Sequence, residues 1–185
     1  RNADEILRFQ ARDPALILLL ADTGCRACGA AGLCEGNVDF DTGRATVTEK
    51  GDRTRLVAFG TECSVLLRAW LVRRRANRGD WVFSTHGQPI SSEAISQIVR
   101  RACLRVGVRS LGSHSLRHRK GHQLADAKIA PTIAATALGH SDPATTMRYY
   151  YPADWESAEK ALRELAHNAD VPGKVVRFPF RKVES

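Results

Sequence analysis

The sequence predicts a single, mainly helical α+β domain with a small three-stranded antiparallel sheet. Apolar residues recur at helical spacing through most of the 185 residues, and the period changes to two between residues 37 and 59. No internal repeat or low-complexity linker divides the chain, which is long enough for one domain with an ordinary hydrophobic core. We therefore expect one folded domain over residues 1–167 and a basic C-terminal tail over residues 168–185.

The amino-terminal part is predicted to be helical and to be followed by the sheet. Residues 4–10 and 14–21 each carry apolar side chains at helical spacing, and Thr23 and Gly24 end the second run. Strands are predicted near residues 38–40, 45–48 and 55–59, because alternating patterns there are separated by turn sequences at 41–44 and 50–52. Short turns between successive strands predict an antiparallel meander.

The remainder of the chain is expected to contain five helices. Amphipathic patterns place them at residues 62–77, 91–106, 113–125, 131–137 and 152–166. A short extended segment is expected at 80–83, and an edge strand at 175–178. The last helix has an apolar face with Trp155, Leu162 and Leu165, which fits docking onto the same chain or onto a neighbouring subunit, and the sequence leaves both open.

The composition favours a polyanionic partner and disfavours a membrane protein. Lys and Arg total 28 against 20 Asp and Glu, which gives a formal net charge of +8, and the basic residues are clustered. The longest apolar run, residues 15–21, is far shorter than the roughly 20 residues of a membrane helix. The chain opens with Arg and without an apolar leader, so we expect no secretory signal and leave open that the chain is a fragment.

The five cysteines do not predict a disulfide framework or a zinc site. Cys25 and Cys28 have the two-residue spacing of a zinc site and Cys34 lies nearby, but no second pair completes four ligands. An odd number of cysteines cannot all pair, and nothing indicates an oxidising compartment. We therefore expect reduced, partly buried thiols.

Six reactive side chains stand at the edges of predicted elements rather than in apolar stripes. Arginine's planar fork binds two oxygens of a phosphate, while histidine and lysine move protons near neutral pH. A tyrosine becomes a covalent nucleophile when its proton is removed and the developing charge is neutralised. A reaction at a phosphodiester therefore suits the set formed by Arg26, Lys50, His114, Arg117, His140 and Tyr149.

Four motifs in a fixed order contain these residues. They read Thr23-Gly24-Cys25-Arg26 after an apolar helix, Glu49-Lys50-Gly51 before a basic strand, His114-Ser115-Leu116-Arg117-His118, and Leu138-Gly139-His140-Ser141 with paired threonines and then Tyr149. Through these motifs the sequence resembles the catalytic domain of the tyrosine site-specific recombinases, the phage integrase family, across roughly residues 3–166. The resemblance implies the tyrosine-recombinase catalytic core as the fold.

The resemblance also implies an enzyme that cleaves and rejoins DNA strands. Tyr149 would attack a DNA phosphate and form a 3′-phosphotyrosyl intermediate. Arg26 and Arg117 would hold the two non-bridging oxygens, and Lys50 would protonate the departing 5′-oxygen from its hairpin turn. Because the phosphotyrosine retains the energy of the broken bond, the resemblance implies no metal and no cofactor.

The two histidines have separate roles in this scheme. His114 would exchange the proton of Tyr149, and His140 would donate a hydrogen bond to the phosphate. Three successive tyrosines require a choice of nucleophile, and the spacing favours Tyr149 over Tyr150 and Tyr151.

The implied partner is double-stranded DNA. We expect a homotetramer on synapsed DNA, a monomer or weak oligomer when free, no membrane association, and a cytoplasmic location at the nucleoid. The DNA target sequence and the biological role, whether integration, excision or dimer resolution, do not follow from the sequence.

Two positions depart from the family pattern. The residue three after Arg26, commonly acidic in the family, is Gly29, so acidic support for this arginine must come from elsewhere or be absent. The segment after the His-x-x-Arg box, usually small and apolar, is Arg119-Lys120-Gly121-His122, which is unusual in a helix that is expected to pack.

Three other functions remain as alternatives. His114, His118 and His122 are spaced by four and could line one helix face as metal ligands, although no glutamate of a metalloprotease motif stands between the first two. A catalytically inactive DNA-binding module of the same fold is a second alternative. A type IB topoisomerase-like or telomere-resolving relative is a third, because such enzymes use a similar set of residues.

Overall fold

The computed structural model describes residues 3–74, 80–85, 87–150, 159–160 and 163. Its contacts divide the chain into two compact units, Arg1–Tyr150 and Tyr151–Ser185. The predicted strand at 175–178 lies outside the described residues. Of the predicted helix at 152–166, only residues 159, 160 and 163 are described, and they are helical. The domain boundary at residue 167 therefore stays a prediction.

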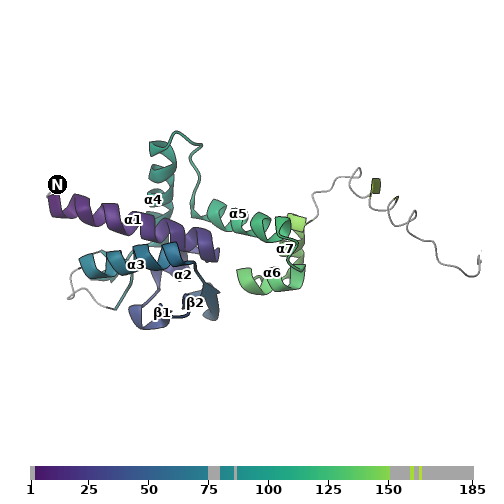
Figure 1. Ribbon diagram of the computed structural model, residues 1–185, viewed down its shortest axis with the longest axis horizontal. Helices are drawn as coiled ribbons and strands as arrows, with labels where there is room; N and C mark the ends of the chain where they lie inside the picture. Colours follow the sequence, from purple (N-terminus) through teal and green to yellow (C-terminus); the bar gives the residue numbers. More distant parts are fainter. Residues whose placement is uncertain (1–2, 75–79, 86, 151–158, 161–162, 164–185) are drawn as a thin grey trace, which may run out of the picture. The chain divides into compact units, whose positions relative to one another are not determined.

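Two long helices lie side by side and form one layer of the first unit (Figure 1). They are α1 (Ala3–Thr23) and α3 (Thr61–Arg73). The two predicted runs at 4–10 and 14–21 are one continuous helix, with Pro14 inside it. A proline inside a helix costs about 3 kcal/mol, but Leu16, Leu19 and Leu20 beyond it are completely buried, and this burial outweighs the cost.

The predicted meander is present, and it confirms the mainly helical α+β fold class. Strands β1 (Val38–Asp39), β2 (Arg44–Glu49) and β3 (Arg53–Ala58) pair antiparallel in the order β1-β2-β3, after a short 3₁₀ turn, η1 (Glu35–Asn37). The register pairs Glu49 with Arg53 beside the turn. In β2 the buried positions are Ala45, Val47 and Glu49, so a carboxylate continues the stripe that faces the core.

A second small hairpin was not predicted. The extended segment expected at 80–83 contains only an isolated bridge at Trp81, and the strands β4 (Ser84–Thr85) and β5 (Gln88–Pro89) follow it. Val82 and Phe83 are completely buried, and the amide of Val82 donates to the carbonyl of Leu33 at 2.7 Å. These two residues therefore fill the core, and strand pairing begins after them.

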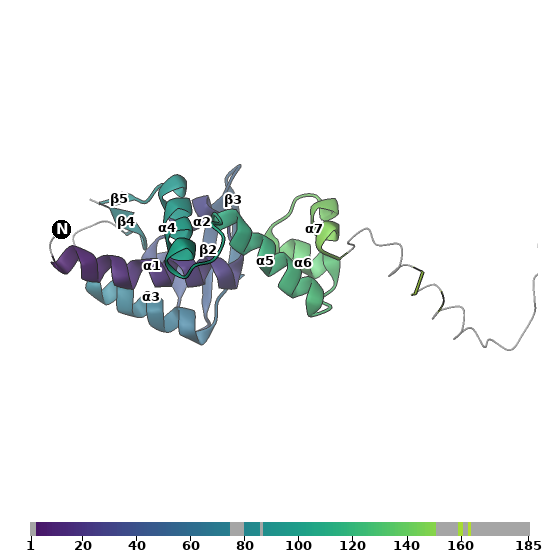
Figure 2. The ribbon, with the colours of Figure 1, turned by 90° about the horizontal axis from the view of Figure 1, so that it is seen from above.

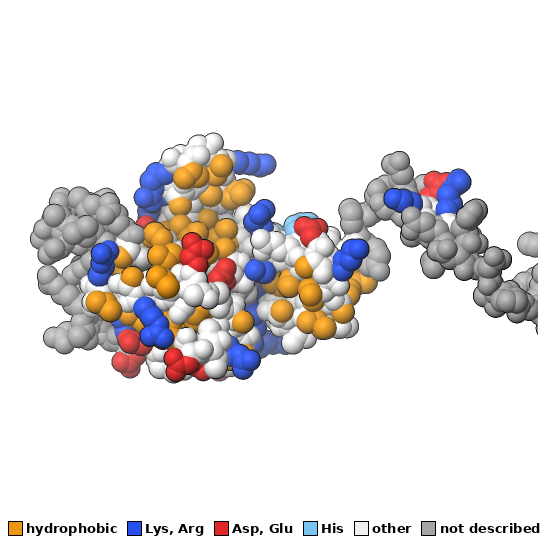
Figure 3. All heavy atoms as spheres, viewed as in Figure 1, with side chains coloured by type: hydrophobic (Ala, Val, Ile, Leu, Met, Phe, Trp, Pro, Cys, Tyr) orange, Lys and Arg blue, Asp and Glu red, His pale blue; other side chains and the backbone are white. Residues whose placement is uncertain are grey.

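Helices α2 (Ala27–Ala31) and α4 (Ser92–Arg105) pack against each other. The start of α4 matches the prediction because Ser91 caps it: its hydroxyl accepts a hydrogen bond from the amide of Ala94 at 3.1 Å. Leu104, Val106 and Val108 stay exposed at the end of α4 and in the loop after it, where Figure 3 shows apolar side chains on the surface.

Three helices complete the unit beside the sheet, as Figure 2 shows. They are α5 (Ser113–Asp126), α6 (Pro131–Leu138) and α7 (Pro143–Tyr150), and α5 contacts α1, α6 and α7. Helices α5 and α6 were predicted, and α7 was not. Gly139 ends α6 with φ 67°, a left-handed conformation that glycine adopts without strain, and it thereby directs the chain toward His140.

All five cysteines are unpaired in the structure, and Cys25 and Cys63 are buried. Among the described residues, no helix is long and apolar enough to cross a membrane.

Trp70 joins α3 to the buried segment after residue 80. Its indole nitrogen donates to the carbonyl of Val82 at 2.7 Å, and the residue is 4% exposed. We expect Trp70→Phe to lower the free energy of unfolding by about 1–3 kcal/mol, because a buried carbonyl loses its donor. Urea unfolding measures this, with Val72→Ala on the same helix as the control, since Val72 is 87% exposed. Equal effects of the two substitutions would contradict the assignment.

Candidate active site

Helix α5 carries two adjacent stripes of functional side chains. Its buried stripe contains Ser113, Arg117 and Gly121, at intervals of four residues. The next stripe is solvent-exposed and consists of His114, His118 and His122. Residues four apart lie on one face of a helix, so the sequence itself separates an arginine facing the protein from histidines facing outward.

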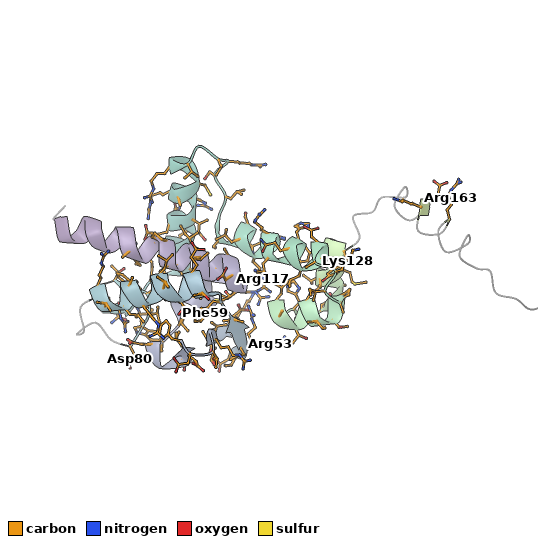
Figure 4. The ribbon with its side chains drawn as sticks, in the orientation of Figure 1. Arg53, Phe59, Asp80, Arg117, Lys128 and Arg163 are labelled. Carbon is orange, nitrogen blue, oxygen red and sulfur yellow. The ribbon has the colours of Figure 1, made fainter. Side chains whose placement is uncertain are left out.

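The end of α1 provides the surroundings of the buried arginine. The hydroxyl of Thr23, the last residue of α1, donates to the carbonyl of Leu19 at 2.6 Å, and Gly24 after it takes the left-handed conformation with φ 60°. The carbonyl of Gly24 then accepts a hydrogen bond from Nη1 of Arg117 at 2.8 Å. Arg117, labelled in Figure 4, projects from α5 toward this helix end, and its side chain is 3% exposed.

Glu49 connects three arginines at one point. Its Oε1 accepts from the backbone amide of Arg26 at 2.7 Å and from Nη2 of Arg55 at 3.2 Å, and it lies 3.9 Å from Nη1 of Arg117. Its Oε2 accepts from Nη1 of Arg26. The Glu49 side chain is 2% exposed, whereas that of Arg26 is 37% exposed. Three guanidinium groups against one carboxylate leave an excess of two positive charges.

The electrostatics of this cluster follow from burial and from like charges. Burial, with help from the charge of Arg26, lowers the pKa of Arg117 to about 10. Burial alone would raise the pKa of Glu49, but hydrogen bonds from Arg26 and Arg55 and the charge of Arg117 lower it, so the carboxylate stays ionised. Two nitrogen atoms, Nε of Arg55 and Nη2 of Arg117, are buried without a hydrogen-bond partner. Such donors suit an incoming anion.

Tyr149 lies against the next turn of α5. Its hydroxyl is 3.1 Å from Nδ1 of His118, and its ring contacts those of His122 and His140, with centroids 5.2 and 6.3 Å away. A Cβ on Gly121 would lie only 2.6 Å from Cε2 of Tyr149. The glycine in the unusual segment 119–122 therefore provides the space for the tyrosine ring.

Of the two predicted histidines, His140 stacks on this tyrosine and His114 contacts His118. Nδ1 of His140 is hydrogen-bonded to the hydroxyl of Thr146 at 2.7 Å. Burial and the charges of the nearby arginines lower the pKa of His140 to about 4. The ring of His114 contacts that of His118 edge-on, with centroids 4.6 Å apart, and burial lowers its pKa as well. Both rings are thus neutral at pH 7.

Five of the six residues proposed from the sequence lie in one region. Arg26 and Arg117 meet at Glu49, while His140 stacks on Tyr149 and His114 contacts His118. Lys50 is exposed in the turn between β2 and β3, and no hydrogen bond or ion pair between described residues joins it to the other five. The tyrosine hydroxyl is hydrogen-bonded to His118 and not to His114, so the proton-transfer role of His114 stays a prediction.

Sequence reasoning missed three residues of the site, namely Glu49, Arg55 and His118. Glu49 had a detectable signal, because it shares the period-two stripe of the buried Ala45 and Val47. A charged residue in such a stripe must find a partner. Arg55 lies six residues from Glu49 in the same predicted hairpin and could have been found as its partner. His118 gave no such signal, because its contact with Tyr149 spans 31 residues.

The cysteine and histidine spacings do not assemble a metal centre. Within the part of the chain that the structure describes, no group of three or more His, Cys, Asp and Glu side chains is arranged to hold a metal ion.

Comparisons with known proteins agree with this architecture. The model of the phage integrase family matches residues 2–156. The chain is 34% identical over 151 residues to tyrosine recombinase XerC of Corynebacterium glutamicum, covering 80% of this chain and 48% of the relative. It is 32% identical over 149 residues to tyrosine recombinase XerD of Neisseria meningitidis serogroup B, covering 77% and 51%. The chain therefore belongs to the phage integrase family.

Solved structures show the same likeness. The XerH site-specific recombinase bound to difH substrate, in a pre-cleavage complex, superposes with a TM-score of 0.72 at 26% identity, over 88% of this chain and 48% of that one. The XerA recombinase gives a TM-score of 0.71 at 25% identity, over 90% and 63%. The chain spans about half the length of the XerC and XerD relatives it matches.

The environment of His140 predicts an unusual titration. Its imidazole should stay neutral until the pH approaches about 4, whereas a free histidine titrates near 6.5. Because the folded pKa is depressed, the ring contributes stability above pH 6.5 that is lost as the pH falls toward 4. NMR titration of the imidazole signals measures the midpoint, and His140→Gln should make the pH dependence of the unfolding free energy shallower over this window. A midpoint near 6.5 would contradict the structure.

The contact between Gly121 and Tyr149 predicts the effect of one methyl group. Gly121→Ala should displace the Tyr149 ring and remove the hydroxyl contact with His118, because the new Cβ overlaps the ring. Alanine also gains about 1 kcal/mol of helix propensity, so stability should change little. Nuclear Overhauser contacts between the rings of Tyr149 and His122 measure the displacement. The matched control is Gln123→Ala on an exposed position of the same helix, and contacts that persist in Gly121→Ala would refute the steric account.

Proposed function

We propose that this chain is the DNA-cleaving and rejoining part of a site-specific recombinase. The observation that carries the proposal is the meeting of Arg26 and Arg117 at Glu49, with Nη2 of Arg117 buried and unpartnered. Tyr149 packs on Gly121, which follows Arg117 by one turn, about 6 Å along α5. An anion held by these arginines would therefore lie within reach of a tyrosine hydroxyl.

The charge of the cluster fits the proposed reaction. A DNA phosphodiester carries one negative charge, and attack by a phenolate raises it to two in the five-coordinate transition state. The arginine cluster carries an excess of two positive charges that is fixed before the reaction begins. Preorganised charges of this kind stabilise a transition state more than the ground state.

In the first step Oη of Tyr149 bonds to phosphorus, and the bond from phosphorus to the 5′-oxygen breaks. The phenolic proton passes to the histidines beside it, through His118, which is hydrogen-bonded to the hydroxyl, or through His114. Lys50 donates a proton to the departing 5′-oxygen from its exposed turn. A 5′-hydroxyl of a second strand then attacks the phosphotyrosine and reverses these steps, so no external energy source is consumed.

The relatives support the choice of substrate. The XerH structures are pre-cleavage and post-cleavage complexes with difH substrates. We infer double-stranded DNA as the partner of this chain, a homotetramer on synapsed DNA, and a location in the cytoplasm at the nucleoid. The formal net charge of +8 favours such a partner.

Covalent capture tests the proposal and identifies the DNA site in the same experiment. The chain is incubated with nicked duplexes that contain a randomised segment, and DNA that stays attached to protein after denaturation is sequenced. We expect a defined sequence to be recovered through a phosphotyrosine. Tyr149→Phe should abolish the adduct, because it removes the attacking oxygen.

Tyr150→Phe is the matched control, since its hydroxyl donates to the carbonyl of Ile129 and is engaged in packing. This variant should retain the adduct. An adduct that persists in Tyr149→Phe would show that Tyr149 is not the nucleophile. Recovery of DNA that is bound but never covalently attached would favour the inactive DNA-binding module.

A further inference from the structure

Glu49 uses both carboxylate oxygens to hold Arg26. Oε1 accepts from the backbone amide at 2.7 Å, and Oε2 accepts from the guanidinium of the same residue. Oε1 also receives Nη2 of Arg55 at 3.2 Å. A guanidinium is planar and its donors diverge in fixed directions, so a carboxylate bound to it fixes its orientation.

The space for this carboxylate exists because residue 29 has no side chain. A Cβ on Gly29 would lie 3.1 Å from Cγ of Glu49 and 3.4 Å from its Oε1. Gly29 is buried in α2, which packs on β2. Positions 29 and 49 thus share one volume between helix and strand, and in this chain the strand fills it.

Burial of the carboxylate does not serve the apolar core. An ion pair taken out of water is seldom more stable than apolar residues of the same volume. The cluster moreover leaves Nη2 of Arg117 and Nε of Arg55 buried without partners. The buried carboxylate of Glu49 is therefore best explained by the arginine side chains that it orients.

We propose that Glu49 is the positioning residue of the phosphate site, and that a carboxylate in the volume shared by residues 29 and 49 orients the guanidinium group of Arg26, with Nη1 of Arg117 3.9 Å from the same carboxylate, for an incoming phosphate. This inference rests on the proposed function. Glu49 acts through the arginines and does not itself contact the substrate, since its negative charge would repel a phosphate.

Relocation of the carboxylate tests the proposal. Glu49→Gln and Glu49→Ala should lower the rate of adduct formation about a hundredfold, the loss typical of reacting groups misplaced by about 1 Å. An aspartate introduced by Gly29→Asp begins at the Cβ position that lies beside the present carboxylate. The double variant Gly29→Asp, Glu49→Ala should therefore form the adduct at least ten times faster than Glu49→Ala alone. The matched control, Gly29→Ala with Glu49→Ala, fills space without charge and should recover nothing.

A sulfur leaving group distinguishes the arginines from the neighbouring lysine. Glu49 precedes Lys50, so its loss could act by shifting the turn. A duplex with a 5′-bridging phosphorothiolate needs no proton on its leaving group. With this duplex the rate of adduct formation should be restored in Lys50→Ala but not in Glu49→Gln. Full restoration of Glu49→Gln by sulfur would overturn the proposal, as would equal rates of the two double variants.

A readout that needs no DNA separates this inference from the proposed function. In the NMR spectrum of the free chain, the Nε–H signals of the three arginines should be dispersed and slow to exchange. They should collapse in Glu49→Gln, which keeps the side-chain shape, and return in the relocation variant. If the unaltered chain forms no adduct with any duplex, the proposed function fails, and these signals still decide whether Glu49 orders the arginines. Signals unchanged in Glu49→Gln would refute the inference alone.

Discussion

The buried carboxylate of Glu49 partly neutralises three guanidinium groups that come from the start of α2, from β3 and from α5. Without a counter-charge, these groups could not share a region of low dielectric, because removing one partner from a buried ion pair typically costs about 3–5 kcal/mol. The contact thus joins the sheet to both helices at one point. Arg26 is hydrogen-bonded to Glu49 through its backbone amide and its guanidinium, and Nη1 of Arg117 lies 3.9 Å from the same carboxylate.

The cluster is also incomplete, because two of its buried nitrogen atoms have no hydrogen-bond partner. A buried donor without a partner costs about 1–3 kcal/mol, and Arg55 and Arg117 each have one. A fold built only for stability would have satisfied these donors or replaced them by apolar atoms. Both nitrogen atoms lie inside the fold without a partner, and this is the observation on which the proposed anion site rests.

The sequence predicted most elements well, and its errors have physical causes. Periodicity located α4, α5, α6 and the meander because each has one buried face. Helix α7 was not predicted, because it packs largely through Thr146 and Tyr149, whose polar groups form no apolar stripe. Pro14 suggested a break between two helical runs, but the burial of α1 against its neighbours overrides this local preference.

The sequence predicted the motif residues of the candidate site but not the residues that they contact. Motifs identified Arg26, Arg117 and Tyr149, because local sequence sets their positions on elements. Their partners depend on long-range contacts: Arg26 and Glu49 are 23 residues apart, and Arg117 and the Gly24 carbonyl are 93 apart. The absence of an acid at position 29 was visible in the sequence, but its replacement from a strand could be recognised only after α2 and β2 were seen to pack together.

The site divides charge between groups that are always ionised and groups that are neutral at rest. Burial and the field of the nearby arginines keep His140 neutral down to a pH of about 4. An anion bound between the arginines would cancel much of that field and raise the proton affinity of the same ring. A neutral imidazole still donates from the one ring nitrogen that carries its proton, so His140 needs no charge of its own to donate a hydrogen bond to an anion held there.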